Sequence, residues 1–407
     1  MEMLKQADWR RPDSVAPADL DATVRAVIDA VAERGDAAVT EYSRKFDGYE
    51  PSIIELQPWE QYPLSDETKA HLRVAAERIQ TFAKMQFEMY RDVEREDHYG
   101  RFGQTVKALP SMAAYIPGGR FPLVSTALMT LIPARVAGVP RRVAVSPSNE
   151  PAILAAASLA GATAFVHMGG AQAIAALALG SQWADPVDMI VGPGNAYVNA
   201  AKGLLQGKVK IDTLAGPSEI LVLCDDSVDP RWLALDVLAQ AEHDPMALSV
   251  LATTDEALLQ RIAAAVETEL AKDPDKDEGV IQLVHCENRE QMVALANEMG
   301  AEHLHLACRE GTIQPDEIDH YGSLFIGGHS AVALGDYCTG PNHTLPTLAV
   351  ARRKGGLQVG DFLKVLTWQQ VKPDRYGELA KTAIHLAQLE GLVFHERSLQ
   401  VRLPESS

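Results

Sequence analysis

From about residue 110 onward, the sequence alternates between short runs rich in β-branched residues and longer stretches rich in alanine. Short apolar runs bounded by turn residues are typical of buried strands, and longer alanine-rich stretches are typical of helices. A strand followed by a helix and a second strand pairs in parallel, because parallel neighbours need a long crossover connection. The alternation therefore restricts the central region to a parallel α/β architecture.

The predicted strands fall into two consecutive series. The first series comprises residues 142–145, 163–167, 189–191 and 209–211. The second series comprises residues 220–223, 249–252, 280–284, 303–307 and 324–326. We interpret the chain as an α/β protein with two doubly wound, Rossmann-like units.

The two ends of the chain show helical spacing instead. Apolar residues recur at helical intervals between Leu20 and Val31, and a long helix is predicted from Ser65 or Asp66, either of which is a suitable N-cap. Beyond about residue 356 the pattern is helical again, from 375 to 395. A terminal segment of this size buries little surface of its own, so we expect it to pack on another surface, such as a partner subunit.

These patterns predict three parts. Residues 1–110 form a helical lead-in that packs with residues 218–356, and together they make a first, discontinuous α/β domain. Residues 111–217 form a second α/β domain, and residues 357–407 form a small C-terminal helical segment.

The balance of charge limits the partners of the chain. Its 407 residues include 37 Lys and Arg against 55 Asp and Glu, which gives a formal net charge of −18. Such a field repels phosphate backbones and anionic headgroups, so it argues against nucleic-acid and membrane partners. The sequence has no long apolar run free of charge, and its amino terminus lacks the pattern of a secretory signal, so we expect a cytoplasmic protein.

Three turns around the first series of strands are rich in glycine. They are residues 115–119, 168–172 and 192–195, and the last two follow a predicted strand and open a helix. Such turns allow backbone N–H groups and a helix N-terminus to approach a phosphate along one crevice of a parallel sheet. None matches G-x-G-x-x-G, and glycines that merely permit tight turns are the alternative. Three such turns in one unit favour a ligand.

Polar side chains gather in four places that could form a metal or substrate site. Gln240 and His243 lie three residues apart near the end of a predicted helix, so they share a face and could bind one metal ion. A helix end exposed to solvent is the alternative. The four cysteines are widely spaced, without a C-x-x-C pair, so we do not expect a disulfide framework or a thiolate zinc site.

The other three places are residues 335–343, the pair Glu302 and His303, and residues 390–395. Adjacent side chains on a strand point to opposite faces, so Glu302 and His303 could share one substrate only if the strand begins in an irregular turn. Each place also has a simpler explanation as a capped turn or a solvated surface. If the four converge, they indicate a metal site built from histidine, carboxylate and amide ligands.

Taken in order, the motifs resemble those of the histidinol dehydrogenase family. They are Tyr-Ile-Pro-Gly-Gly at 115, Gly-Gly-Ala-Gln-Ala at 169, Val-Gly-Pro-Gly-Asn-Ala-Tyr-Val at 191, Ala-Gly-Pro-Ser-Glu at 215, Ala-Gln-Ala-Glu-His-Asp at 239, Glu-His-Leu at 302, Gly-Asp-Tyr at 335 and Asn-His-Thr-Leu-Pro-Thr at 342. The resemblance extends from about Val27 to the end of the chain. It implies a zinc-dependent enzyme that oxidises a primary alcohol through an aldehyde to a carboxylate, with two hydride transfers to NAD. It also implies that residues 111–217 bind NAD and that the C-terminal segment exchanges between the subunits of a homodimer.

The resemblance assigns roles to particular residues. The implied zinc ligands are Gln240, His243, Asp336 and the partner subunit's His395. The implied substrate contacts are Ser218, His343 and the partner subunit's Glu390, and the implied NAD contacts are Tyr115, Gln172 and Asn195. His303 would be the general base for the alcohol and Glu302 the base that activates water on the aldehyde. This chemistry is coherent, because a histidine suits removal of the alcohol proton and a carboxylate suits water activation.

The sequence departs from the pattern of the family at three places. Val332 and His305 stand where an acidic residue is usual, and Arg120 stands where a small residue usually follows Pro-Gly-Gly. These changes replace negative charge by neutral or positive groups, which suits an anionic substrate better than a cationic one. We therefore expect a small anionic alcohol such as 2,3-dihydroxypropane-1-sulfonate, oxidised to sulfolactate as in the sulfopropanediol dehydrogenase branch of the family, with Arg120 as a substrate contact.

Two alternatives stay open. The departures could be neutral changes in a true L-histidinol dehydrogenase, which converts L-histidinol to L-histidine. The fold could also serve a nucleotide-binding protein without turnover, because a fold does not determine a function. The presence of every implied metal and catalytic residue argues against this second alternative.

Overall fold

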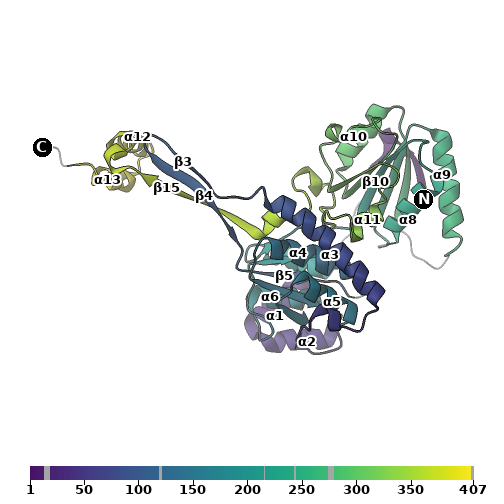
Figure 1. Ribbon diagram of the computed structural model, residues 1–407, viewed down its shortest axis with the longest axis horizontal. Helices are drawn as coiled ribbons and strands as arrows, with labels where there is room; N and C mark the ends of the chain where they lie inside the picture. Colours follow the sequence, from purple (N-terminus) through teal and green to yellow (C-terminus); the bar gives the residue numbers. More distant parts are fainter. Residues whose placement is uncertain (13–18, 119–121, 215, 243, 274–278, 405–407) are drawn as a thin grey trace. The chain divides into compact units, whose positions relative to one another are not determined.

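The computed structural model describes residues 1–12, 19–118, 122–214, 216–242, 244–273 and 279–404. These residues form two compact units (Figure 1). The first unit combines Met1–Gln86 with Leu109–Phe362, and the second combines Phe87–Ala108 with Leu363–Ser407. Both units are therefore assembled from segments that are distant in the sequence. No helix among the described residues is long and apolar enough to cross a membrane.

The first sheet of the first unit has six strands. In spatial order they are β2 (Ser52–Ile54), β7 (Ala164–His167), β6 (Arg141–Ser146), β5 (Ser111–Tyr115), β8 (Met189–Val191) and β9 (Lys210–Ile211). All pairs are parallel except β2 with β7. The parallel strands follow the order third, second, first, fourth and fifth in the chain, which is the doubly wound arrangement. The predicted α/β fold is thus confirmed for this sheet.

The first sheet is covered by helices that precede its strands in the chain and by helices that connect them. α1 (Leu20–Arg34), α2 (Asp36–Phe46), α6 (Gly170–Leu179) and α7 (Ala196–Leu205) share one apolar core with the strands. α4 (Val124–Val136) and α5 (Pro151–Ala160) pack against each other outside this cluster. The long α3 (Asp66–Phe87) begins where predicted, and Ser65 Oγ accepts a hydrogen bond from the Thr68 N–H at 3.0 Å.

The second sheet repeats the same strand order and is entirely parallel. Its strands are β1 (Glu2–Lys5), β12 (Val280–His285), β11 (Leu248–Thr253), β10 (Glu219–Cys224), β13 (His303–Ala307) and β14 (Ser323–Ile326). α8 (Pro230–Ala241) and α9 (Glu256–Leu270) bury one core against the sheet, and α10 (Arg289–Met299) buries a separate one. The short α11 (Val332–Tyr337) follows β14.

The second unit is small and has an antiparallel sheet. β4 (Gly100–Ala108) pairs with β15 (Leu363–Val371) on one side and with β3 (Val93–Glu96) on the other. Two helices, α12 (Tyr376–Leu389) and α13 (Val393–Gln400), follow β15, and the Tyr376 hydroxyl donates to the Leu399 carbonyl oxygen at 2.8 Å.

Residues 1–110, which were predicted to form one helical lead-in, are divided between the first sheet, the second sheet and the second unit. α1, α2 and β2 belong to the first sheet and its core, not to the part formed by residues 218–356. β1 alone joins the second sheet, while β3 and β4 belong to the second unit. Helical periodicity indicates which face of a helix is apolar but not which sheet buries it. The C-terminal segment also opens with the strand β15, whose alternation is weak because most of its residues are exposed.

A buried ion pair holds the turn that follows β8. Lys202 Nζ and Asp212 Oδ1 lie 2.5 Å apart, and both side chains are buried. Lys202 Nζ donates to the Gly192 carbonyl oxygen at 2.9 Å, and the Gly192 N–H donates to Asp212 Oδ2 at 2.7 Å. Gly192 has a φ of +112°, and a Cβ atom there would lie 2.2 Å from the Tyr115 carbonyl oxygen. Both the pair and the glycine are needed for the path of this turn.

We predict that Lys202→Met lowers the free energy of unfolding by about 3 to 5 kcal/mol, because it leaves the Asp212 carboxylate buried without its partner. Urea unfolding followed by circular dichroism measures this change. Lys208→Met, at an exposed position of the same region, is the matched control and is expected to change stability by less than about 0.5 kcal/mol. A loss of less than about 1 kcal/mol for Lys202→Met would contradict the role assigned to the pair.

Candidate active site

The register between β10 and β13 brings two of the sequence motifs together at the amino ends of these strands. Ile220 pairs with His303, so Ser218 and Glu219 lie beside Glu302. Glu302 Oε2 accepts a hydrogen bond from Ser218 Oγ at 2.6 Å and another from the Glu219 N–H at 2.9 Å. These two hydrogen bonds fix the orientation of the carboxylate.

Glu302 and His303 form the adjacent acid and imidazole that the sequence predicted. Glu302 lies in a bend just before β13, which is the irregular start that the two side chains need in order to approach each other. His303 Nδ1 is 3.7 Å from Glu302 Oε2 and 3.2 Å from the Glu219 carbonyl oxygen. Both residues are buried: Glu302 is 7% exposed and His303 is 5% exposed.

Gln240 joins this cluster from the last turn of α8. Its Nε2 donates to Ser218 Oγ at 2.7 Å, and the residue is only 4% exposed. The alternative of a solvent-exposed helix end is therefore wrong for Gln240. His243, the predicted second ligand of this motif, lies outside the described residues.

Asp336 faces His303 from α11. Its Oδ1 lies 3.9 Å from His303 Nε2. Burial raises the pKa of Asp336 to about 6, the neighbouring imidazole of His303 opposes this rise, and the negative charge of Glu302 adds to it. A buried carboxylate with a raised pKa is an anion that lacks enough compensating positive charge.

The donor set of this cluster fits a zinc ion. The Gln240 amide nitrogen donates to Ser218, which leaves the amide oxygen as the atom that could bind a metal. Asp336 supplies a carboxylate whose negative charge is only partly balanced by its surroundings. Nitrogen and oxygen donors of this kind suit a zinc ion that also binds a substrate. Within the described ranges, no group of three His, Cys, Asp or Glu side chains is placed to hold a metal. The predicted quartet is not tested by this finding, because one ligand is an amide, His243 is not described and His395 belongs to the second unit.

The remaining predicted substrate contacts lie on different parts of the chain. His343 is half-buried in the segment after α11, where the Asn342 side chain donates to the Met129 carbonyl oxygen at 2.6 Å. Glu390 and His395 are exposed residues of the second unit, at the end of α12 and in α13. Their contribution from a partner subunit stays a prediction.

The predicted NAD contacts lie at the carboxyl ends of strands in the first sheet. Tyr115 ends β5, Gln172 lies in the first turn of α6 after β7, and Asn195 is the N-cap of α7 after β8. The Tyr115 hydroxyl accepts a hydrogen bond from the Gly170 N–H at 3.2 Å, and burial raises the pKa of Tyr115 to about 12. Asn195 Oδ1 accepts from the Val198 N–H at 3.1 Å, so its amide nitrogen is the group left for a ligand. This is the crevice in which doubly wound sheets bind nucleotides.

Sequence reasoning missed two charged residues beside Glu302 and His303. Glu219 is buried at the start of β10 and forms an ion pair with Arg11, whose Nη2 also donates to the Met299 carbonyl oxygen at 2.5 Å. A glutamate that opens an apolar strand is a signal for a buried partner of opposite charge. Arg11 gives no such signal, because its partner lies far away in the sequence.

Two of the three departures from the family pattern are placed by the structure. His305 is fully buried on β13, with Nε2 at 3.0 Å from the Gly327 carbonyl oxygen and Nδ1 at 3.4 Å from Asp236 Oδ2. The change at His305 therefore lies inside the domain, where its ring is engaged by Gly327 and Asp236. Val332 is 5% exposed and belongs to the apolar core next to Phe325. Arg120 lies outside the described residues.

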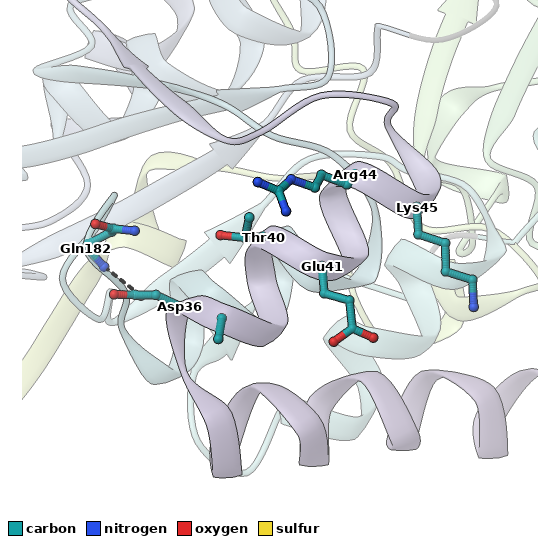
Figure 2. Close-up of a pocket in the computed structure, with 7 residues that line it drawn as sticks. Asp36, Thr40, Glu41, Arg44, Lys45 and Gln182 are labelled. Carbon is teal, nitrogen blue, oxygen red and sulfur yellow. Dashed lines mark hydrogen bonds between the residues drawn. The ribbon is translucent and has the colours of Figure 1, made fainter.

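A surface pocket on α2 does not belong to either cluster (Figure 2). It is lined by charged and polar side chains, including Asp36, Glu41 and Arg44. Asp36 Oδ1 accepts a hydrogen bond from the Gln182 N–H at 3.0 Å, while Glu41 and Arg44 form ion pairs with Arg34 and Glu50. These exposed pairs satisfy one another, so the pocket carries no indication of a ligand.

Comparison with known proteins gives one consistent result. The sequence model of the family described as histidinol dehydrogenase matches residues 10–403. Histidinol dehydrogenase 1 from Nostoc sp. is 41% identical over 405 residues, covering 95% of this chain and 93% of the relative, and histidinol dehydrogenase from Thermus thermophilus is 43% identical over 388 residues, covering 93% of each. The crystal structure of histidinol dehydrogenase from Elizabethkingia anophelis superposes with a TM-score of 0.91 at 32% identity, over 99% of this chain and 98% of that one.

We predict that Asp336→Asn stabilises the metal-free protein near neutral pH. The folded pKa of about 6 lies above the ordinary value of 3.8, so the folded state binds this proton more tightly than the unfolded chain, and stability falls as the pH rises from about 4 to about 6. Removing the charge is expected to raise the free energy of unfolding by about 1 to 2 kcal/mol at about pH 7.5 and to have little effect at about pH 4. Thermal unfolding in the presence of a chelator, at both pH values, measures the difference.

Asp316→Asn, at an exposed position, is the control and should alter neither value. Equal stabilisation by Asp336→Asn at both pH values would contradict an effect of the buried charge. In a zinc titration, the same variant should bind the metal more weakly than the unmodified protein, because it replaces an anionic ligand by a neutral one.

Proposed function

Because the chain belongs to the histidinol dehydrogenase family, we propose that it is a zinc-dependent, NAD-linked dehydrogenase that oxidises L-histidinol to L-histidine through the aldehyde. Family membership confirms the resemblance inferred from the motifs, and it establishes the protein as a dehydrogenase-type oxidoreductase of this family. The observation that carries the proposal is the buried pair Glu302 and His303, joined to Ser218 and Gln240 by short hydrogen bonds. The relatives at about 40% identity bear the name histidinol dehydrogenase, which supports this substrate over the anionic alcohol.

His303 is placed to act as the base for the alcohol proton. Its Nδ1 lies 3.2 Å from the Glu219 carbonyl oxygen, which accepts hydrogen bonds only, so the ring hydrogen resides on Nδ1. Nε2 is then the basic nitrogen, and it points toward Asp336. A hydride leaves the alcohol carbon only as the hydroxyl proton is removed, so His303 Nε2 is the atom that receives this proton.

Glu302 is placed to act in the second oxidation. The hydrogen bonds from Ser218 and Glu219 keep its carboxylate oriented. A charged carboxylate in a buried site takes a proton from water as the water oxygen adds to the aldehyde carbon. The resulting hydrate then loses the second hydride and leaves as the carboxylate.

Both cofactors are part of the proposal. Gln240, His243, Asp336 and the partner subunit's His395 would hold zinc, and Tyr115, Gln172 and Asn195 would contact NAD. Zinc would supply a positive charge that orients the substrate, and NAD would accept the two hydrides.

The second candidate substrate is a small anionic alcohol. The observation in its favour is Val332, which leaves the start of α11 with a buried apolar side chain where an acid is usual in the family. A cationic imidazole and amine would be attracted by an acid at this position, and a sulfonate would be repelled by it. Arg120 is the residue that would contact the sulfonate, and an Arg120→Ala enzyme with unchanged kcat/KM would remove it from this argument.

We predict that the zinc-loaded protein at saturating NAD forms NADH with L-histidinol at a kcat/KM at least about tenfold above that with racemic 2,3-dihydroxypropane-1-sulfonate. NADH absorbance with the two alcohols measured side by side tests this. Turnover of the sulfonate alone would establish the second candidate in place of the first. An enzyme that binds NAD but oxidises neither alcohol would contradict both.

The second unit supports a homodimer. Leu389, Phe394 and Val401 are 71%, 80% and 77% exposed, and Ala380 and Ala387 are the only buried residues of the fully described helices α12 and α13. Apolar side chains exposed to this extent on a small unit are typical of a protein interface. A second copy of the chain is the proposed occupant, because Glu390 and His395 on the same helices are the residues that the family supplies from a partner.

We predict that mixing two inactive variants restores activity. His303→Ala lacks the base and His395→Ala lacks a zinc ligand, so each homodimer should be inactive. In a mixed dimer, one site combines an intact His303 with the partner's intact His395, so random exchange should give about a quarter of the activity of the unmodified protein. Complete inactivity of the mixture, with dimer exchange verified by mass spectrometry, would place His395 in the same subunit as His303.

A further inference from the structure

The α2–β2 connection enters the dinucleotide crevice of the first sheet. Asp47 follows the last turn of α2, and its Oδ2 accepts a hydrogen bond from the Gly169 N–H at 3.2 Å. Gly169 is the N-cap of α6, so the Asp47 carboxylate occupies the position at which a helix N-terminus would bind a phosphate. Burial raises the pKa of Asp47, and the hydrogen bonds from Gly169 and Gln172 oppose this rise.

The same carboxylate orients a predicted NAD contact. Gln172 Nε2 donates to Asp47 Oδ2 at 3.0 Å, which settles the orientation of the amide, because only its nitrogen can donate to a carboxylate. Gln172 is fully buried, and its Oε1 has no hydrogen-bond partner among the described residues. A buried acceptor without a partner costs free energy until a donor reaches it.

Two glycines make this arrangement sterically possible. A Cβ atom at Gly169 would lie 2.9 Å from Asp47 Oδ1, and one at Gly170, where φ is +67°, would lie 2.6 Å from Gln172 Oε1. The glycine turn at 168–172 therefore does more than permit a bend: it leaves room for the Asp47 carboxylate and for the amide that this carboxylate holds.

We propose that Asp47 is a positioning residue of the dinucleotide site, which holds the Gln172 amide so that the cofactor meets its oxygen. An amide oxygen binds a hydroxyl or N–H group of the ligand and not a phosphate, and the α6 N-terminus is already neutralised by Asp47. The proposal rests on the proposed NAD-linked function. It adds that this turn recognises a donor group of the dinucleotide, while the pyrophosphate is bound elsewhere.

The test is the dissociation constant for NAD, measured by isothermal titration calorimetry on the zinc-loaded, full-length protein. Asp47→Leu is expected to weaken NAD binding about tenfold, because the released amide loses its orientation. Asp47→Asn keeps an oxygen that accepts both hydrogen bonds, so it should bind within about threefold of the unmodified protein. In steady-state assays, Asp47→Leu should raise the KM for NAD and leave kcat within about twofold.

Asp36→Leu is the matched control. Asp36 lies at the opposite end of the same helix, is similarly half-buried and also accepts a backbone N–H from a distant segment, as Figure 2 shows. Its hydrogen bond comes from Gln182 and not from the turn at 168–172, so NAD binding should be unchanged. A double variant supplies the second criterion: because Asp47 acts through Gln172, Asp47→Leu combined with Gln172→Leu should bind NAD no more weakly than Gln172→Leu alone.

Two results would overturn the proposal. One is an Asp47→Leu protein that binds NAD as the unmodified protein does while Gln172→Leu binds weakly. The other is a double variant whose loss is the product of the two single losses, which would mean that the residues act independently. Should Asp47→Leu fail to fold by near-ultraviolet circular dichroism, Asp47→Ala carries the same test. Absence of NAD binding by the unmodified protein would instead contradict the proposed function.

Discussion

The parallel pairing of β10 with β13 is the constraint on which the candidate active site depends. With Ile220 opposite His303, the residues that precede both strands are forced into contact, and Ser218, Glu219 and Glu302 become one hydrogen-bonded group. A shift of one residue would turn His303 to the other face of the sheet. The register is held by the apolar residues of both strands, which are buried on both faces. The geometry of the candidate active site is therefore a consequence of core packing.

The two sheets share one strand order, but their candidate functional residues lie at opposite ends of the strands. In the first sheet, Tyr115, Gln172 and Asn195 lie at the carboxyl ends of the strands, where the N-terminus of α7 offers N–H groups and partial positive charge. In the second sheet, Ser218, Glu302 and His303 lie at the amino ends, where α8 terminates beside Gln240. A helix C-terminus carries partial negative charge. In each sheet, the helix ends beside the candidate site thus carry a partial charge opposite to that of the proposed ligand. This ligand is an anionic dinucleotide at the first sheet and a metal cation at the second.

Buried charged side chains stabilise the turns at the strand ends that carry both candidate sites. At the first sheet, Lys202 and Asp212 hold the Gly192 turn, and Asp47 neutralises the start of α6. At the second, Arg11 pairs with Glu219 beside the candidate catalytic residues Glu302 and His303. Each group would be costly if it were buried alone, so each needs its partner in place before the neighbouring turn adopts its conformation. This requirement couples the folding of distant segments to the completion of a site.

Much of the central fold could be predicted from the sequence. All nine predicted strands occur, because buried parallel strands are continuous apolar runs that differ from the alanine-rich helices between them. The strands that escaped prediction are β1 to β5 and β15. Several of these are short or largely exposed, and β5 has small residues that resemble a helix, so their local patterns are weak.

The sequence by itself determined the chemistry that is available, because residue types and the order of the motifs define the family and its candidate acids, bases and ligands. Only the tertiary structure decided which groups meet. It placed Gln240 on Ser218, buried His305 inside its domain, and brought Asp47 and Arg11 to residues far away in the chain. Contacts of this kind leave no local pattern, since a hydrogen bond between remote segments depends on how helices and sheets pack and not on the neighbours of either residue.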